Sequence, residues 1–261
     1  MDLGLNGRVA LVLGAGGGLG GAIAHALARE GAHVAAADVD PASLAATVES
    51  ITGKGGRALA VPMDLARPDM LQAGVVQIGK ALGPVEILVN NSGGPPPTRA
   101  GGVDAGTWES HFRSMVVSLM SLTDLVLPAM QERRWGRIIT SASSGVVSPI
   151  PNLGISNTLR MALVGWSKTL AAEVAPYGIT ANVIVPGRIA TDRIRQLDEA
   201  RARREGKEVE EIARLSTATI PMRRYGDPSE YADTVAFLAS ERASYTTGSV
   251  VRVDGGLIPS V

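Results

Sequence analysis

A glycine-rich turn at residues 14–20 carries the most specific chemistry in this sequence. It reads GAGGGLG, directly follows the apolar run 9–13, and opens an expected helix. The N–H groups at a helix N-terminus bear partial positive charge, and glycines let a phosphate reach them because no Cβ stands in the way. The pattern fits two registers, GxxxGxG and GxGxxG, and is a weak signal by itself. The residues assigned to cofactor binding here are Gly14, Gly18, Leu19 and Gly20.

An acidic residue follows the second apolar run at the position where a dinucleotide site needs one. Residues 33–37 read HVAAA and end in Asp38, about 20 residues beyond the glycine turn. A carboxylate there accepts hydrogen bonds from both hydroxyls of an adenosine ribose and repels a 2′-phosphate. The sequence therefore predicts NAD, with NADP less favoured. The alternative interpretation is that Asp38 only opens the turn 38–41.

The elements that position these residues alternate along the whole chain. Short runs rich in Val, Ile, Leu and Ala alternate with longer Ala-rich stretches, which is typical of β-α units around a parallel sheet covered on both faces. The expected strands are 8–13, 33–38, 57–61, 86–90, 136–141, 179–184 and 249–253, and the expected helices are 18–30, 41–52, 67–81, 104–131, 154–175 and 228–239. With 261 residues and 45% apolar content, we predict a single α/β domain, 1–261, with a doubly wound seven-stranded parallel sheet of the Rossmann type.

Two segments interrupt the alternation, and both follow strand ends. Residues 92–98 read SGGPPPT and form a stiff loop, and residues 188–220 are a charged, helical insertion. Ligands of open α/β sheets bind beyond the carboxyl ends of the strands. We therefore predict that 188–220 is a substrate lid. A solvated helical face is the simpler alternative.

The expected helix 104–131 is apolar on more than one face, so it must be covered on several sides. Its large apolar residues are Trp108, Phe112, Met115, Val116, Leu119, Met120, Leu122, Leu125 and Val126. Contact with a second subunit would cover the face turned away from the sheet, and burial within the monomer is the alternative. We predict a homo-oligomer, either a dimer or a tetramer.

Composition excludes several classes of function. Lys plus Arg and Asp plus Glu both number 25, so no charge excess favours nucleic acid or an anionic membrane. The sequence has no cysteine, and its three histidines are not spaced as metal ligands. We see no signal peptide and no apolar stretch of the roughly 20 residues that cross a bilayer. These features predict a cytoplasmic protein with a small-molecule substrate and no metal site.

With the glycine turn and Asp38 in place, the chain resembles the short-chain dehydrogenase/reductase family over nearly its full length, and in particular its 3-oxoacyl-ACP reductases. The further matches are Asp64 and Leu65, Asn90 within NNSG, Pro186 and Gly187 followed by Thr191, and the C-terminal run 238–256. The resemblance implies that Asp64 and Leu65 contact the adenine, and that the Pro-Gly and Thr element holds the nicotinamide end. Asp64 could instead be a strand-end cap.

The same resemblance exposes a departure in the catalytic residues. In the family a Ser orients the substrate oxygen, a Tyr passes the proton, a Lys lowers the pKa of the Tyr and holds the nicotinamide ribose, and an Asn supports the Lys. Here Ser143 falls on the Ser, but Ser156 stands at the Tyr, Arg160 at the Lys and Met115 at the Asn. Arg160 can grip ribose hydroxyls and stabilise an alkoxide, but it does not give up a proton. Tyr225 is the only conceivable substitute tyrosine.

The expected size of the lost catalytic contribution favours a slow enzyme over an inactive one. General acid catalysis contributes about 10²- to 10⁴-fold, whereas the hydride belongs to the cofactor. We predict an NAD-linked oxidoreductase acting on a ketone or 3-oxo compound or a secondary alcohol, with Ser143, Ser156 and Arg160 at an atypical active site. Water held by these three residues would deliver the proton. The alternative is a catalytically silent NAD-binding sensor or scaffold.

Overall fold

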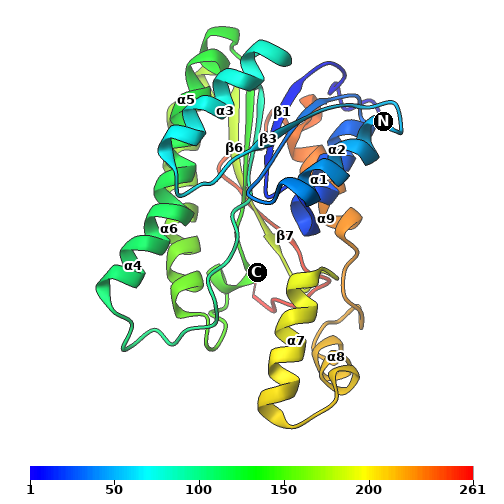
Figure 1. Ribbon diagram of the computed structural model, residues 1–261, viewed down its shortest axis with the longest axis vertical. Coiled ribbons are helices and arrows are strands. Elements are labelled where there is room, and N and C mark those ends of the chain that lie inside the picture. The colour runs from blue at the N-terminus through cyan, green and yellow to red at the C-terminus, as the bar shows by residue number, and fades with distance from the viewer. Residues whose placement is uncertain (261) are drawn as a thin grey trace.

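The computed structural model describes residues 1–260 and has at its centre a parallel sheet with the strand order β3-β2-β1-β4-β5-β6-β7 (Figure 1). The strands are β1 Val9–Leu13, β2 His33–Asp38, β3 Arg57–Pro62, β4 Ile87–Asn90, β5 Gly136–Ser141, β6 Ile179–Pro186 and β7 Val250–Val253. This doubly wound order confirms the predicted fold class and single domain. The order reverses between β1 and β4, which is where such sheets bind their ligands.

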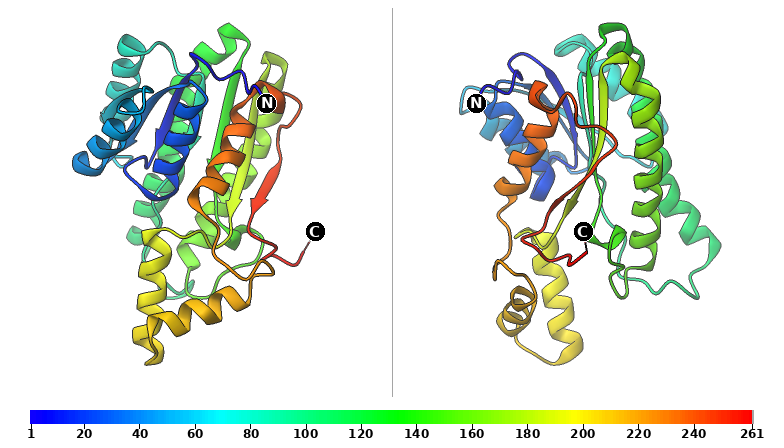
Figure 2. Two further views of the ribbon diagram at one scale, coloured as in Figure 1. Left: turned by 90° about the vertical axis from the view of Figure 1, so that its right-hand side faces the viewer. Right: turned by 180° about the vertical axis from the view of Figure 1, so that it is seen from behind.

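Helices cover both faces of the sheet (Figure 2). They are α1 Gly18–Arg29, α2 Pro41–Thr52, α3 Pro68–Ala81, α4 Ala105–Phe112, α5 Ser118–Arg133, α6 Gly154–Val174, α7 Asp192–Glu205, α8 Val209–Ala218 and α9 Pro228–Ala239. Apolar residues of α1, α2 and α9 form one core cluster, and those of α3, α5 and α6 form another on the opposite face. Side chains alternate along a strand, so β1 supplies Leu11 to one cluster and Val12 to the other. This explains its continuous apolar sequence.

The predicted helix 104–131 is divided. A π-helical segment, Arg113–Val117, separates α4 from α5, and it contains Met115, which is 4% exposed in the core. By length and composition, Ala105–Arg133 is apolar enough to cross a membrane, so the prediction that no such stretch exists was wrong. Val116 and Leu122 nevertheless lie in the core cluster. Packing in the core therefore explains part of the apolar character of this segment.

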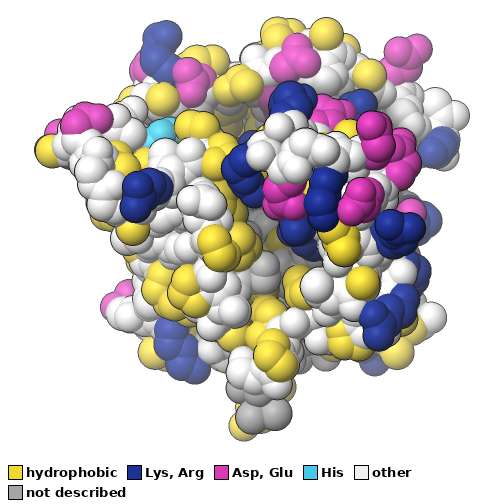
Figure 3. Space-filling view, turned by 90° about the horizontal axis from the view of Figure 1, so that it is seen from below, with side chains coloured by type: hydrophobic (Ala, Val, Ile, Leu, Met, Phe, Trp, Pro, Cys, Tyr) yellow, Lys and Arg dark blue, Asp and Glu magenta, His cyan; other side chains and the backbone are white. Residues whose placement is uncertain are grey.

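The charged insertion 188–220 contains two helices, α7 and α8, which project beyond the carboxyl ends of the strands (Figure 1). Seen from that end, acidic and basic side chains gather over them (Figure 3). Asp198 on α7 is 4% exposed and accepts from Arg188 Nη1 at 3.1 Å and from Tyr225 Oη at 2.5 Å. Arg188 precedes the helix pair and Tyr225 follows it. Asp198 therefore links α7 to the chain segments on both sides of the two helices.

Candidate active site

A single pocket of about 1000 Å³ opens at the carboxyl ends of the strands. The glycine turn lines it with Gly14, Gly18 and Leu19, and the loop after β5 lines it with Ser143. Other predicted site residues that line it are Asp38, Ser156, Arg160, Pro186, Gly187 and Thr191. The structure therefore brings most of the predicted cofactor residues and all three predicted catalytic residues into one space.

The glycine turn has a backbone shape that side chains would prevent. Gly14 has φ +64° and Gly18 has φ +54°, a region that L-residues rarely adopt. A Cβ on Gly20 would collide with the carbonyl oxygen of Gly14, whereas a Cβ on Gly17 would meet nothing within 4 Å. The turn is therefore tight on its inner side and open on its pocket side, at the N-terminus of α1. This cradle fits a pyrophosphate.

Thr191 lies beside this turn. Its Cγ2 is 3.9 Å from the point where a Cβ on Gly18 would stand, and its Oγ1 accepts the backbone N–H of Ile194 as the N-cap of α7. The element that the family resemblance assigns to the nicotinamide end thus stands next to the turn that would hold the phosphates. It also begins the first helix of the insertion.

Asp38 lines the pocket near the glycine turn, where the sequence predicts the adenosine ribose. Its Oδ2 accepts the backbone N–H of Gly16 at 2.9 Å, and its Oδ1 accepts that of Asp40 at 3.1 Å. A carboxylate has about four lone-pair sites, so two sites remain for ribose hydroxyls. Asp38 therefore both shapes the glycine turn and keeps acceptor capacity toward the pocket. The turn interpretation and the ligand interpretation of Asp38 are compatible.

Ser143 and Ser156 bring two hydroxyls to the pocket from different elements. Ser143 follows β5, and its Oγ accepts the backbone N–H of Gly145 at 3.1 Å. This bond leaves the hydroxyl proton of Ser143 free to be donated. Ser156 is in the first turn of α6 and is 7% exposed. Neither hydroxyl is acidic, so each can orient an oxygen and relay a proton but is a poor source of one.

Arg160 lies one turn further along α6, 8% exposed, with its guanidinium bound to backbone carbonyls. Nη1 donates to Ser141 O at 3.1 Å, and Nη2 donates to Ser92 O at 3.1 Å and to Gly93 O at 3.2 Å. Burial lowers the pKa of Arg160 from its usual value, although a guanidinium still remains charged. Arg160 therefore holds the ends of β4 and β5 together and places a positive charge on the pocket wall.

Two tyrosines near the site have other partners. Tyr225 does not line the pocket, and its hydroxyl donates to Asp198. Tyr231 on α9 is fully buried, and its Oη is 2.8 Å from Ser141 Oγ. Burial raises the pKa of Tyr231, so its phenol is a weaker acid than usual. Sequence reasoning missed this neighbour of the site because Tyr231 occupies an apolar position of a core helix.

Some predicted cofactor residues lie outside the pocket wall. Leu65 packs on the core, Asp64 Oδ1 accepts the backbone N–H of Ala66, and Asn90 is fully buried beside Thr123. The next residue, Asn91, lines the pocket instead, and its side-chain amide donates to Leu13 O at 3.1 Å. The adjacent asparagines in NNSG gave no basis for choosing between them. Gly20 shapes the turn from inside.

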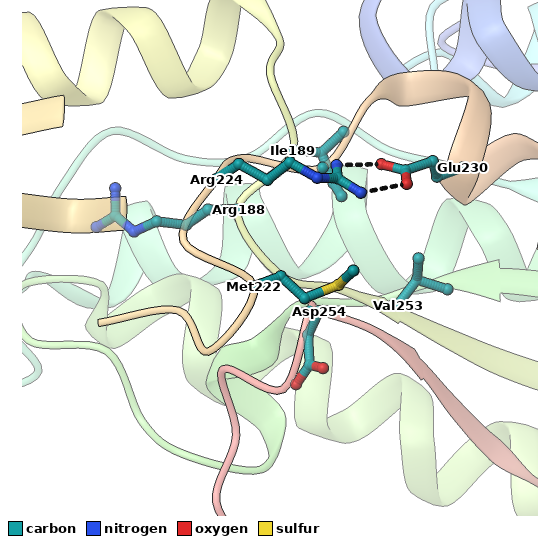
Figure 4. A pocket seen from close by; sticks show the side chains of 9 residues that line it. Arg188, Ile189, Met222, Arg224, Glu230, Val253 and Asp254 are labelled. Atoms are coloured by element: carbon teal, nitrogen blue, oxygen red, sulfur yellow. Dashed lines mark hydrogen bonds and ion pairs between the residues drawn. The ribbon is translucent and has the colours of Figure 1, made fainter. Parts of the chain in front are cut away.

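A second, smaller cavity of about 80 Å³ lies between the ends of β6 and β7 (Figure 4). Two of its charged groups satisfy each other, because Arg224 makes two hydrogen bonds to Glu230, at 2.7 and 2.6 Å. This cavity is too small for a cofactor. Within residues 1–260, no group of three or more His, Cys, Asp or Glu could hold a metal ion.

Comparison with known proteins matches this geometry to one family. The family model described as enoyl-(acyl carrier protein) reductase matches residues 14–258. Nodulation protein G of Azospirillum brasilense is 36% identical over 253 residues, covering 96% of this chain and 98% of that protein. The chain belongs to the short-chain dehydrogenase/reductase family. A 3-oxoacyl-(acyl-carrier-protein) reductase of Vibrio cholerae is 34% identical over 255 residues, covering 97% of this chain and 98% of that protein.

Solved structures of short-chain dehydrogenases/reductases support the same assignment. L-sorbose reductase of Gluconobacter frateurii, complexed with NADPH and L-sorbose, has a TM-score of 0.95 at 33% identity and covers 100% of both chains. A variant of actinorhodin polyketide ketoreductase with NADPH has a TM-score of 0.92 at 30% identity, covering 97% of this chain and 98% of that one. The family resemblance inferred from the sequence is confirmed, and with it a nicotinamide-dependent type of oxidoreductase.

Proposed function

We propose that this protein interconverts a ketone or 3-oxo compound with a secondary alcohol, using NAD(H) and an atypical proton route. The observation that carries the proposal is the single pocket of about 1000 Å³ that joins the glycine turn to Ser143, Ser156 and Arg160. A protein that only bound a dinucleotide would need no hydroxyl groups beside the nicotinamide end. The relatives named for 3-oxoacyl and L-sorbose reduction act on ketones, which supports the same substrate class.

Asp38 supports NAD as the preferred cofactor. Two backbone N–H groups use only part of its acceptor capacity, so we assign the rest to the hydroxyls of the adenosine ribose, and its negative charge disfavours a 2′-phosphate. The two solved relatives described above contain NADPH, so the comparisons do not support NAD, and the proposed preference rests on Asp38 alone. We assign phosphate binding to the turn at Gly14 and Gly18 and nicotinamide binding to Pro186, Gly187 and Thr191. When bound, the cofactor supplies the hydride.

The chain's own residues then have three tasks at the reacting carbonyl. Ser143 donates its free hydroxyl proton as a hydrogen bond to the substrate oxygen. The positive charge of Arg160 stabilises negative charge that develops there, because a preorganised cation in a buried pocket acts strongly on a nearby oxyanion. Ser156 holds a water molecule that passes a proton to the developing alkoxide and regains one from the bulk solvent that reaches the pocket, since neither Ser156 nor Arg160 is an adequate acid. The insertion 188–220 closes the pocket as a lid.

The test is a transfer experiment with NADH deuterated at the transferable position. Reduction of a ketone or 3-oxo ester should place one deuterium on the carbinol carbon of the alcohol, detected by mass spectrometry. A Ser143→Ala variant that keeps its affinity for NADH should be slower by about 10²-fold, the scale of a lost oxyanion donor. Equal rates in the two proteins would remove Ser143 from the mechanism.

We also propose that the protein assembles as a cytoplasmic homo-oligomer through the outer face of α4, the π-helical segment and α6. Phe112 and Met161 are 42% and 47% exposed there, and Val117 is 38% exposed. Large apolar side chains grouped on one surface are typical of subunit contacts. Light scattering should give a mass of two or four chains, and Phe112→Asp should reduce it.

A further inference from the structure

Two guanidinium groups meet at the loop that follows β4, inside the pocket of the proposed active site. Arg160 reaches this loop from α6 and donates to Ser92 O and Gly93 O, and Arg193 reaches it from α7 and donates to Pro95 O at 3.0 Å. Both residues line the pocket. The loop between them contains Gly94, so the two cations approach the same short stretch of backbone from two different helices.

Because Gly94 has no side chain, a small space remains beside the two cations. A Cβ on Gly94 would lie 3.7 Å from Nη2 of Arg193 and 3.9 Å from Nη2 of Arg160. The φ of Gly94 lies outside the left-handed region, so the backbone itself does not require glycine here. A small group placed at this point would therefore be in reach of both guanidinium groups.

Neither cation is neutralised by the protein. Within residues 1–260, no carboxylate forms an ion pair with Arg160 or Arg193, whereas Arg188 on the same pocket wall is paired with Asp198. The acidic residues that line the pocket are committed elsewhere: Asp192 binds Arg195, and Asp38 accepts two N–H groups at the glycine turn. The charge of Arg193 adds to the effect of burial in lowering the pKa of Arg160, so the two cations repel each other.

A third donor stands at the same loop without a partner. Ser92 lines the pocket and is 8% exposed, and its buried Oγ has no hydrogen-bond partner in the described chain, residues 1–260. A buried hydroxyl without a partner costs free energy unless a ligand or water satisfies it. Ser92 also gives its carbonyl to Arg160. The loop thus combines two uncompensated positive charges with one unused hydroxyl.

We infer that Arg160, Arg193 and Ser92 form an anion site over Gly94 that binds the carboxylate of the substrate, so the substrate is an oxo or hydroxy carboxylate. This inference rests on the proposed function, because it specifies the compound that the site reduces or oxidises. Guanidinium groups match carboxylates in geometry and charge. Arg193 is on the lid helix, so carboxylate binding also connects α7 to the floor of the pocket.

The test compares each carboxylate with its neutral amide. Calorimetry measures binding of acetoacetate, acetoacetamide, 4-oxopentanoate and 4-oxopentanamide to the protein alone and to the protein saturated with NADH. The inference predicts that at least one acid binds about tenfold or more tightly than its amide, in both states. If no acid of the series does so, the inference is wrong. If NADH abolishes the preference, the cations belong to the cofactor phosphates, and the inference is equally wrong.

Three variants locate the site. Arg193→Gln and Gly94→Ala should each reduce the preference for the acid about tenfold, the first by removing a charge and the second by filling the space. The control is Arg195→Gln, which removes a charge from the same helix at an exposed residue paired with Asp192. It should leave the preference unchanged. A loss of NADH affinity in Arg193→Gln with an unchanged acid preference would contradict the inference.

These binding measurements do not require turnover, so they separate the inference from the proposed function. Preferential binding of acids, without reduction of any ketone, would contradict the proposed oxidoreductase activity and leave the anion site established. Reduction of neutral ketones, without any preference for acids, would support the activity and overturn the anion site.

Discussion

Arg160 donates a hydrogen bond to the carbonyl oxygen of Ser141 across 3.1 Å, at the carboxyl end of β5. Its other bonds go to the carbonyls of Ser92 and Gly93, just beyond the end of β4. One side chain, which the sequence resemblance matches to the family's lysine, therefore joins the two loops that border the pocket. A lysine ammonium is a compact point charge with three donors, whereas the guanidinium fork can serve carbonyls on both loops and keep N–H groups in reserve.

Removal of this side chain tests its role. We expect Arg160→Ala to weaken NADH binding by about 10- to 100-fold, because hydrogen bonds to charged groups contribute about 1.5–3 kcal/mol and the two loops lose their common donor. Fluorescence titration of NADH measures the effect. Arg160→Lys should recover part of the affinity. Unchanged NADH affinity in a folded Arg160→Ala variant with no turnover would mean that Arg160 acts on the substrate alone.

Asp38 should set the choice between the two nicotinamide dinucleotides. The wild type is expected to bind NADH about tenfold more tightly than NADPH, which is the scale of one charge-assisted hydrogen bond. Asp38→Ala should narrow this difference. Because Asp38 also accepts the N–H groups of Gly16 and Asp40, thermal melting must confirm that the variant is folded. Equal affinities in the wild type would contradict the NAD assignment.

Restoring the family's residues tests the proposal that this chain lacks a general acid. The triple substitution Ser156→Tyr, Arg160→Lys and Met115→Asn rebuilds the family's proton route, and it should raise ketone reduction by up to about 10²- to 10⁴-fold. Steady-state oxidation of NADH with ketones and 3-oxo esters measures the gain. The changes must be combined, because a phenol without the adjacent lysine keeps a pKa near 10 and catalytic groups act as a unit.

Met115 needs its own control in this design. Its side chain is 4% exposed within the core cluster beside the π-helical segment, so an asparagine there introduces a buried amide. The double variant Ser156→Tyr and Arg160→Lys separates loss of stability from a catalytic effect. A stable triple variant that binds NADH but works more slowly than the wild type would show that the wild type has its own proton route.

Glu230 gives a prediction for stability against pH. Hydrogen bonds from Arg224, and then from the backbone of Asp227, lower the pKa of Glu230 from 4.5 to about 2. A group with a lower pKa in the folded state stabilises the fold above its unfolded pKa and loses this effect as the pH falls toward the folded pKa. Glu230→Gln should therefore lower the Tm at neutral pH, and the difference should disappear between about pH 4.5 and pH 2. If the difference in Tm between the wild type and Glu230→Gln stayed constant across this range, the ion pair between Arg224 and Glu230 would not be its cause.

Much of the fold could be predicted because strands and helices have different apolar patterns. The run VALVL at β1 has every residue buried, and such a run is typical of a strand between two helical layers. The glycine turn could also be predicted, since glycine permits the positive φ that Gly14 and Gly18 adopt. The family resemblance, and not the apolar pattern, predicted that Ser143, Ser156 and Arg160 belong to one site.

Long-range partners could not be predicted. Nothing in the spacing indicates that Arg193 reaches Pro95, or that Tyr231 approaches Ser141 from α9. These contacts depend on how loops and helices from distant parts of the sequence meet at the carboxyl ends of the strands. The π-helical segment Arg113–Val117 was also invisible, because its apolar residues fit a continuous helix. Side-chain identity constrains the local element, whereas the partner depends on tertiary packing.

The central claim is that the pocket transfers a hydride with Ser156 and Arg160 at the positions that the resemblance assigns to the tyrosine and the lysine. A single-turnover experiment tests it most directly: enzyme in excess over deuterated NADH is mixed with each member of a panel of neutral ketones, 3-oxo esters and oxo acids, and both products are quantified. Our account predicts that at least one compound yields one equivalent of NAD and one of singly deuterated alcohol. Enzyme that holds NADH in complex, yet leaves it fully reduced with every compound over many hours, would contradict the account and favour a silent dinucleotide-binding protein.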